Sequence, residues 1–481
     1  MANDLNEKAP AISWLGQLFV PLGSVLGSIE TALLCSILLT QFAMLFLLFR
    51  VGLGMSLGSR LNPAAGVLFV AASQLFVGLS HQMFVEPLQA LATVWMFYVA
   101  LKAPDWPKSR IAVHWGAALV LGLAAKVSSP AYCLLPCIYC VYLLVRKPGV
   151  PDFQMEWKVP SSRIVMVAFG CRAILCALWY GRHYAEVWRT AHNSSWGDVA
   201  LNYGSRDTFS HKFVLWCGLF VESFLSPILP WGYVIAIVIA VVVHLSPSNP
   251  SQHRRWLSVQ PVAVLSAIQI ALMLVVFSLN ITVEPRYMFA LLPCLSILFM
   301  QLCVFLPRKA TAALLALGAV QWALVNGFSL GIGGHISAPS RWLQPVHPEW
   351  SQYDELARAV RLTDSAGRYN IVAVEEPWLN ANSAQFFAAK QSLKTGPRGS
   401  YTSVGYAQQD VGAAMRHIDE FQARYVITLD ESHQSRTPNF LNIVSSRVLE
   451  RMRGDSRFSP IPFESGHGVL IFRIDPGTPA F

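Results

Sequence analysis

Apolar residues form long runs separated by short polar segments through the first two thirds of the 481-residue chain. A helix needs about 20 mostly apolar residues to cross the roughly 30 Å hydrocarbon layer of a membrane. The pattern therefore predicts about ten membrane-spanning helices, at residues 30–50, 62–80, 86–101, 111–127, 130–146, 163–181, 228–245, 258–279, 288–306 and 310–331.

Two further segments before residue 331 have a different pattern. Residues 11–28 are apolar but contain Pro21 and three glycines, which favours an interfacial or re-entrant segment over a straight span. Residues 182–212 carry aromatic side chains among polar ones, and we expect a loop there. It is followed by the amphipathic stretch 213–226, which predicts a helix lying along the membrane surface.

Beyond residue 345 the chain has the mixed polar and apolar pattern of a water-soluble domain. It predicts a small α/β layer domain, with helices at 351–363, 409–421 and 437–452 and strands at 369–376, 423–430, 458–464 and 468–474. We thus expect an N-terminal segment (1–28), a transmembrane domain (29–331) and a soluble C-terminal domain (332–481).

Composition agrees with a membrane protein, since 54% of the residues are hydrophobic and only 13% are charged, against about 25% in soluble domains. The net charge of +9 does not indicate nucleic-acid binding, because Lys and Arg occur in short clusters between apolar runs. The nine cysteines lie mostly within those runs, and we infer neither a disulfide framework nor a metal site from them.

The basic clusters orient the chain, because Lys and Arg are enriched in cytoplasmic loops. Alternate loops hold them: Arg50 and Arg60, residues 102–110, residues 146–163, residues 254–255 and residues 308–309. The loops 81–86, 182–212 and 280–287, and everything beyond residue 332, then face the outside. This predicts a multi-pass protein of the plasma (inner) membrane with an extracytoplasmic C-terminal domain.

The same alternation also places Met1 outside, although the first residues contain no signal peptide. Either residues 11–28 cross or enter the bilayer, or the chain is truncated at its N-terminus. We prefer the truncated start.

Three sites combine charge with an outer helix end. Glu86 precedes Pro87 at the start of a predicted helix, Lys126 ends another, and Arg286 stands beside Tyr287. Ionisable groups at membrane depth are costly, which makes each a functional candidate. Structural alternatives stay open: a helix cap for Glu86, an interfacial position for Lys126, and an anchor pair with Glu284 for Arg286 and Tyr287.

Together, Glu86, Lys126 and Arg286 are predicted to lie at one outer face. A carboxylate there could act as general base towards an acceptor hydroxyl or amine, while the cations stabilise the phosphate of a leaving lipid.

The chain resembles the membrane-embedded glycosyltransferases of the GT-C class, in particular the bacterial mannosyltransferase-like and aminoarabinose-transferase-like proteins that use polyprenyl-phosphate sugars. The resemblance covers most of the chain and rests on three motifs. They are the acidic residue before Pro in HQMFVEP (Glu86), the Lys of GLAAKVSSP (Lys126), and the Arg-Tyr pair of EPRYMFALLP (Arg286 and Tyr287).

In this family the first helix and first large outer loop hold the main catalytic acid. Only Asp4 and Glu7 are acidic before the PLGSVLGS segment, and neither has the family's local pattern. The resemblance therefore implies a chain that lacks this N-terminal region.

We expect a polytopic α-helical membrane protein, GT-C-like, that transfers a sugar from a polyprenyl-phosphate donor to an acceptor at the outer face. The resemblance implies that Glu86 is catalytic, or holds a divalent metal, and that Lys126, Arg286 and Tyr287 bind the donor phosphate. The soluble domain would shape acceptor access. The sugar, the acceptor and the metal requirement stay open, as do two alternatives: a non-catalytic GT-C-like scaffold or partner-dependent subunit, and a lipid or solute transporter.

Overall fold

The structure is a computed structural model in which the chain folds into two compact units, Ala2–Val346 and His347–Phe481. The boundary predicted near residue 331 falls outside the described residues. The described residues are 11–475 except 56–59, 81, 146–160, 198–199, 202, 226–227, 246–258, 328–348, 397, 406–407 and 435–440; of residues 161–177, 223, 225, 243–245, 327 and 394–395 only the backbone is described.

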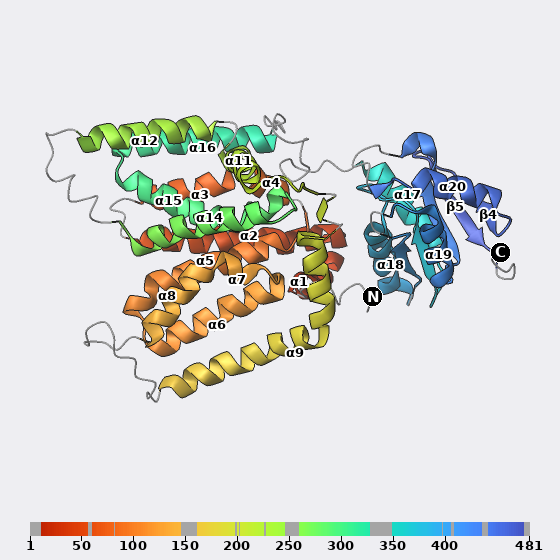
Figure 1. Cartoon of the computed structure of the whole chain (residues 1–481), viewed down its shortest axis with the longest axis horizontal. Helices are drawn as coiled ribbons and strands as arrows, with labels where there is room; N and C mark the ends of the chain where they lie inside the picture. Colours follow the sequence, from red (N-terminus) through yellow and green to blue (C-terminus); the bar gives the residue numbers. More distant parts are fainter. Residues whose placement is uncertain are drawn as a thin grey trace. The chain divides into compact units, whose positions relative to one another are not determined.

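The first unit is helical (Figure 1). Its elements include α1 (Ala11–Leu26), α2 (Ile29–Gly54), α3 (Leu61–Ala71), α4 (Gln74–Ser80), α5 (Glu86–Lys102), α6 (Lys108–Ala125), α7 (Ser129–Tyr132), α8 (Leu134–Val145), α9 (Ser161–Ser195), α11 (Phe209–Phe220), α12 (Leu229–Leu245), α14 (Pro261–Leu279), η3 (Pro285–Leu291), α15 (Leu292–Val304) and α16 (Arg308–Gly327).

Each predicted span coincides with one of these helices or with a consecutive pair. Residues 62–80 form α3 and α4, which meet at a bend of 63°. By length and apolar composition, three helices among the described residues are able to cross a membrane, and up to four if the bent pair counts as one span. The polytopic helical fold is thus present, although several predicted spans are shorter than a straight crossing requires.

The loop predicted at 182–212 is wrong in its first half, because α9 continues as a helix to Ser195 and Figure 1 shows it bending on the way. The polar and aromatic side chains in this part of α9 interrupt the apolar pattern from which the spans are predicted. Residues 11–26 also form one helix that continues through Pro21. Gly27, with φ of 70°, makes the turn into α2.

Buried glutamines satisfy the backbone groups that the helix breaks leave without partners, as membrane-embedded breaks require. The Gln321 amide donates to the carbonyl of Ala72, between α3 and α4, at 2.9 Å. Its oxygen accepts from the N–H groups of Ile228 and Leu229, at the start of α12. The Gln269 amide likewise donates to Ala131 and accepts from Leu135 at the α7–α8 break.

Close packing joins α2, α3 and α15 around Met300. A Cβ added at Gly66 would lie 2.4 Å from the Met300 side chain, and one at Gly52 would lie 2.7 Å from its sulfur. The Ser296 hydroxyl donates to the Gly66 carbonyl at 2.7 Å. The missing side chains at the two glycines therefore allow the three helices to approach closely.

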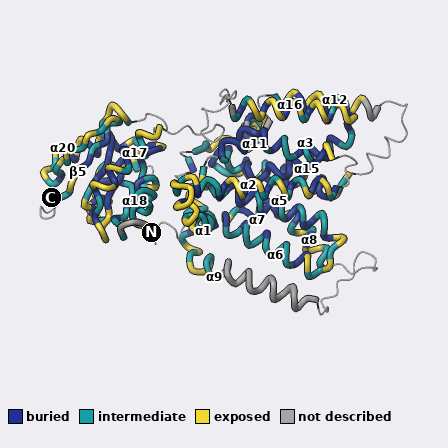
Figure 2. The backbone as a smooth tube through the Cα atoms, turned by 180° about the vertical axis from the view of Figure 1, so that it is seen from behind, coloured by how far each residue is buried: buried dark blue, intermediate teal, exposed yellow. Residues whose placement is uncertain are grey.

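The exterior of this unit is apolar where α12 lies. Figure 2 shows buried residues along the inner helices and many exposed ones on α12 and α16. On α12 the exposed residues are large and hydrophobic, including Trp231, Ile235, Val238 and Val242. Such a surface is expected where a helix faces lipid rather than water.

The second unit is the predicted α/β domain. Its five-stranded sheet has the order β2-β1-β3-β5-β4. The first three strands are parallel, and β5 and β4 pair antiparallel: β2 (Ser400–Ser403), β1 (Tyr369–Val372), β3 (Tyr425–Leu429), β5 (Val469–Ile474) and β4 (Phe458–Ile461).

Helices cover both faces of this sheet, so apolar residues fill two cores. On one face α17 (Trp350–Leu362) and α18 (Ala381–Thr395) contribute Leu356 and Ala384. On the other, α19 (Val411–Glu420) and α20 (Ser445–Gly454) contribute Ile418 and Val448. The prediction missed α18 and β2, and it made β1 too long, since the chain turns at Glu376, whose N–H donates to the Leu379 carbonyl.

Candidate functional site

Three elements of the helical unit meet at the candidate site. Glu86 is the first residue of α5, with proline after it in the first turn, where the missing N–H costs nothing. Lys126 follows the last residue of α6 and donates its backbone N–H to the Gly122 carbonyl. Arg286 belongs to the short 3₁₀ helix η3, directly before α15.

An ion cluster joins the three side chains. The Lys126 ammonium donates to Glu86 Oε1 at 3.0 Å. Arg286 Nε lies 4.0 Å from the same oxygen and 3.4 Å from Glu284 Oε2. Two carboxylates and two cations thus neutralise one another at a place where isolated charges would be costly.

Aromatic rings surround the two cations. Lys126 Nζ lies 4.3 Å from the ring centre of Tyr287, and the Arg286 guanidinium lies 5.4 Å from the rings of Phe84 and Tyr287. These distances are in the range of cation–π attraction. The buried Tyr132 hydroxyl donates to the Tyr287 carbonyl at 2.7 Å and so ties η3 to α7.

The charged side chains of the cluster differ in their exposure to solvent. The Glu86 side chain is 2% exposed, whereas those of Lys126 and Arg286 are 24% and 26% exposed. An anion approaching this end of the unit would therefore reach the cations before the carboxylate.

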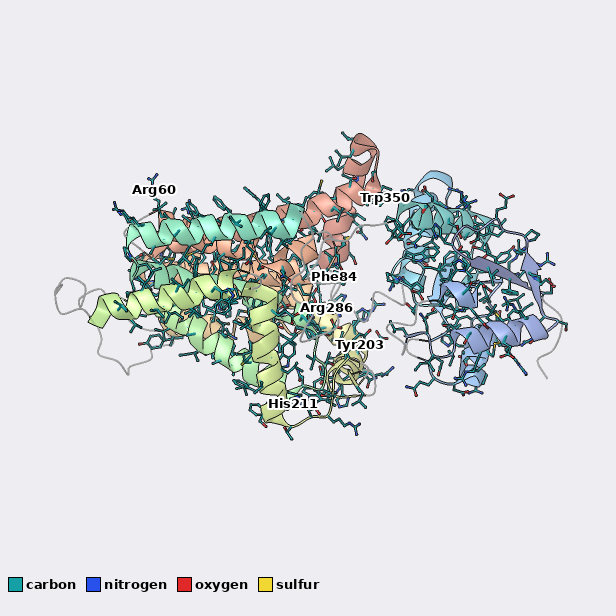
Figure 3. All side chains as sticks on the ribbon, turned by 90° about the horizontal axis from the view of Figure 1, so that it is seen from above. Arg60, Phe84, Tyr203, His211, Arg286 and Trp350 are labelled. Atoms are coloured by element: carbon teal, nitrogen blue, oxygen red, sulfur yellow. The ribbon has the colours of Figure 1, made fainter. Side chains whose placement is uncertain are left out.

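The site lies at one end of the helical unit. Figure 3 shows Phe84, Tyr203 and Arg286 at this end and Arg60 at the other. Glu86 begins α5 and Lys102 ends it, so at about 1.5 Å per residue some 25 Å of helix separate them. The site and the turn at Lys102–Lys108 are therefore at opposite ends of α5 and α6, as the alternation of basic loops predicted.

The structure brings all four predicted site residues together. The structural alternative for Arg286 was an interfacial anchor that pairs with Glu284, and these two side chains are indeed in contact. Arg286 also faces Glu86, which that alternative did not include. The roles assigned to these residues stay predictions. Phe84 and Tyr132 were missed, because a ring contact and a hydrogen bond to a residue 155 positions away leave no local sequence signal.

A metal site is not built by the described side chains. Within the parts of the chain that are described, no three His, Cys, Asp or Glu residues gather as metal ligands. Glu86 is the carboxylate considered for that role, and Lys126 and Arg286 already oppose its charge. We therefore derive no step through a metal.

Comparison with known proteins finds a structural likeness only. No protein-family model and no curated protein sequence matches the chain. The fold is similar to that of ArnT from Cupriavidus metallidurans bound to undecaprenyl phosphate, with a TM-score of 0.57 and 12% identity over 97% of this chain and 88% of that one. Its apo form gives a TM-score of 0.58 and 11% identity over 97% and 87%. The chain has the fold of a GT-C membrane glycosyltransferase.

Proposed function

We propose that this chain transfers a sugar from a polyprenyl-phosphate donor to an acceptor at the extracytoplasmic face of the membrane. One observation carries the proposal: two partly exposed cations, Lys126 and Arg286, stand over one buried carboxylate, Glu86. Cations at a helix end suit a lipid phosphate, and a carboxylate behind them suits a general base. The likeness to an ArnT that binds undecaprenyl phosphate supports the choice of donor.

The chemistry follows from these positions. An acceptor hydroxyl or amine attacks the sugar's anomeric carbon, and the bond from that carbon to the phosphate oxygen breaks. Glu86 takes the proton that the acceptor loses. Lys126 and Arg286 stabilise the negative charge that develops on the departing polyprenyl phosphate. Tyr287 adds a hydrogen bond to that phosphate.

The distribution of basic residues supports the outer location. Arg60 lies at the end of the helical unit opposite the site (Figure 3). The Lys102–Lys108 turn joins the ends of α5 and α6 that are remote from the site. Since basic loops are retained in the cytoplasm, the site end and the C-terminal domain would face outward.

A transfer assay tests the proposal. The purified full chain in lipid nanodiscs is given radiolabelled polyprenyl-phosphate sugars and a panel of hydroxyl and amine acceptors. We expect transfer to fall at least a hundredfold in Glu86→Gln and at least tenfold in Lys126→Gln and Arg286→Gln. Lys102→Gln, at the opposite end of α5, is the matched control and should leave the rate unchanged.

The same assay addresses the non-catalytic scaffold. A chain that binds the donor lipid through Lys126 and Arg286 but transfers no sugar to any acceptor would be a lipid-binding subunit. Equal transfer rates in the wild type and the three site variants would instead show that Glu86, Lys126 and Arg286 do not form the catalytic site.

A further inference from the structure

Two short segments lie side by side beneath the ion cluster. One is the first turn of α5, from Glu86 to Gln89, and the other is the turn from Lys126 to Ser129, closed by the Ser129 N–H donating to the Lys126 carbonyl at 3.0 Å. They are joined at both ends. Lys126 donates to Glu86 at 3.0 Å, and the Gln89 amide donates to Ser128 Oγ at 3.3 Å.

Three side-chain oxygens of these segments are buried and accept or donate no hydrogen bond within the described part of the chain. They are Glu86 Oε2, Gln89 Oε1 and Ser129 Oγ, and the three residues are at most 2% exposed. A buried polar group without a partner is unfavourable, because it has lost its hydrogen bonds to water and gained none in the protein. Three of them in paired segments point to one shared partner.

The chemistry of the three oxygens defines that partner. The carboxylate and the amide oxygen only accept hydrogen bonds, and the hydroxyl can do either. A molecule that donates two hydrogen bonds and accepts one satisfies all three. A water molecule can do this, because it donates two hydrogen bonds and accepts up to two, and internal waters make about three in all.

Charge and burial argue against other partners. Glu86 and Glu284 already face Lys126 and Arg286, so the cluster is neutral and an added cation would leave it positive. Gln89 is fully buried, so a substrate-sized group could not reach its oxygen without the helices separating.

We propose that Glu86, Gln89 and Ser129 hold one internal water molecule beneath the ion cluster. The water fixes the second oxygen of the Glu86 carboxylate. The first oxygen accepts from Lys126 and keeps its other lone pair for the acceptor's proton. Gln89 and Ser129 are then positioning residues for Glu86. This last step rests on the proposed function, since a fixed carboxylate matters most when it receives a proton from a bound acceptor.

A crystal structure of the full chain at a resolution that shows ordered solvent tests the water site. We expect one density peak at about 2.7–3.1 Å from all three oxygens. No peak, or one at the shorter cation distance of about 2.0–2.6 Å, would overturn the inference.

Variants test the assignment. In Gln89→Met and Ser129→Ala the peak should weaken or vanish, because each removes one ligand of the water. The matched control is Thr93→Val on the same face of α5, since the buried Thr93 hydroxyl already donates to the Gln89 carbonyl at 3.0 Å. There the peak should persist, and its loss in the control alone would contradict the assignment.

Kinetics test the positioning role separately. With rates normalised to folded, donor-binding protein, Gln89→Met and Ser129→Ala should lower kcat three- to tenfold and leave the donor KM unchanged. Unchanged kcat in both variants would refute the positioning role. If the wild type transfers no sugar, the proposed function fails, while the density still decides whether the water is there.

Discussion

Glu86 and Lys126 form an ion pair at the centre of the candidate site, with Lys126 Nζ 3.0 Å from Glu86 Oε1 across 40 residues of sequence. The pair joins the start of α5 to the end of α6. It therefore closes a helical hairpin at the end opposite its turn, and it is expected to contribute to stability as well as to function.

Removing Lys126 alone should destabilise the helical unit. In Lys126→Met the nearly inaccessible Glu86 carboxylate still faces Arg286, 4.0 Å away, the one other cation paired with it among the described residues. Removing one partner of a buried ion pair lowers the free energy of unfolding by about 3–5 kcal/mol, because the other charge stays buried without its partner. We expect a loss at the lower end of this range, because the Lys126 side chain is 24% exposed. Reversible unfolding in mixed detergent micelles measures it. In Glu86→Gln/Lys126→Met most of the loss should be recovered, and a double variant less stable than Lys126→Met would contradict a pairing role.

Tyr132 should affect the affinity for the donor lipid without contacting the lipid. Tyr132→Phe removes the 2.7 Å hydrogen bond to the Tyr287 carbonyl, at a cost of about 1 kcal/mol. We expect the affinity for undecaprenyl phosphate to fall about threefold as η3 loosens. Tyr180→Phe removes a similar bond, to the Leu123 carbonyl at 2.6 Å, and should lower stability alone. Equal lipid affinities in the wild type and Tyr132→Phe would refute the effect.

Gly66 should not tolerate a side chain. In Gly66→Ala the new methyl group would meet Met300 at 2.4 Å, and overpacking of this kind costs about 1–3 kcal/mol. Thermal unfolding in detergent should show a lower Tm. Gly181→Ala on α9 is the control, since its Cβ meets nothing within 4 Å, and its Tm should be unchanged or higher. A smaller loss for Gly66→Ala than for Gly181→Ala would contradict the packing.

Glu375 should make the second unit less stable as the pH rises. Burial raises the pKa of its carboxyl from 4.5 to about 7. The folded unit then binds more protons than the unfolded chain between these two values, so its stability falls as pH increases through that window. At higher pH the loss approaches about 3 kcal/mol.

Amide hydrogen exchange of β1 and β3 in the full chain measures this dependence. In Glu375→Gln the protection of these strands should vary less between pH 4.5 and pH 7 than in the wild type. Equal pH dependence in the two proteins would show that another group is responsible.

The helices of the first unit could be predicted because lipid and protein interior both select apolar residues. Where that pattern was interrupted, prediction failed: α9 continues past residue 181 through polar and aromatic residues. In the α/β domain, β2 contains a single buried residue, Tyr401, and α18 has no clear apolar face. Neither produces the periodicity by which strands and helices are recognised.

The candidate site could be predicted in part, since charges at the ends of apolar runs are conspicuous and alternation of basic loops placed Glu86, Lys126 and Arg286 at one end. The contacts that complete the site could not. Tyr132 reaches a carbonyl on η3, and Gln89 pairs with Ser128 across two helices. Uncharged polar residues are common within apolar runs, so the sequence does not single out Tyr132 and Gln89. Their roles become visible only when α5 is packed against α6 and α7.

The most direct test of the central claim is the binding of undecaprenyl phosphate to the full chain in nanodiscs, measured by titration. Lys126→Gln and Arg286→Gln should each raise the Kd at least tenfold, while Lys102→Gln, at the far end of α5, should leave it unchanged. Equal Kd values for the wild type and both site variants would contradict a phosphate site at this ion cluster.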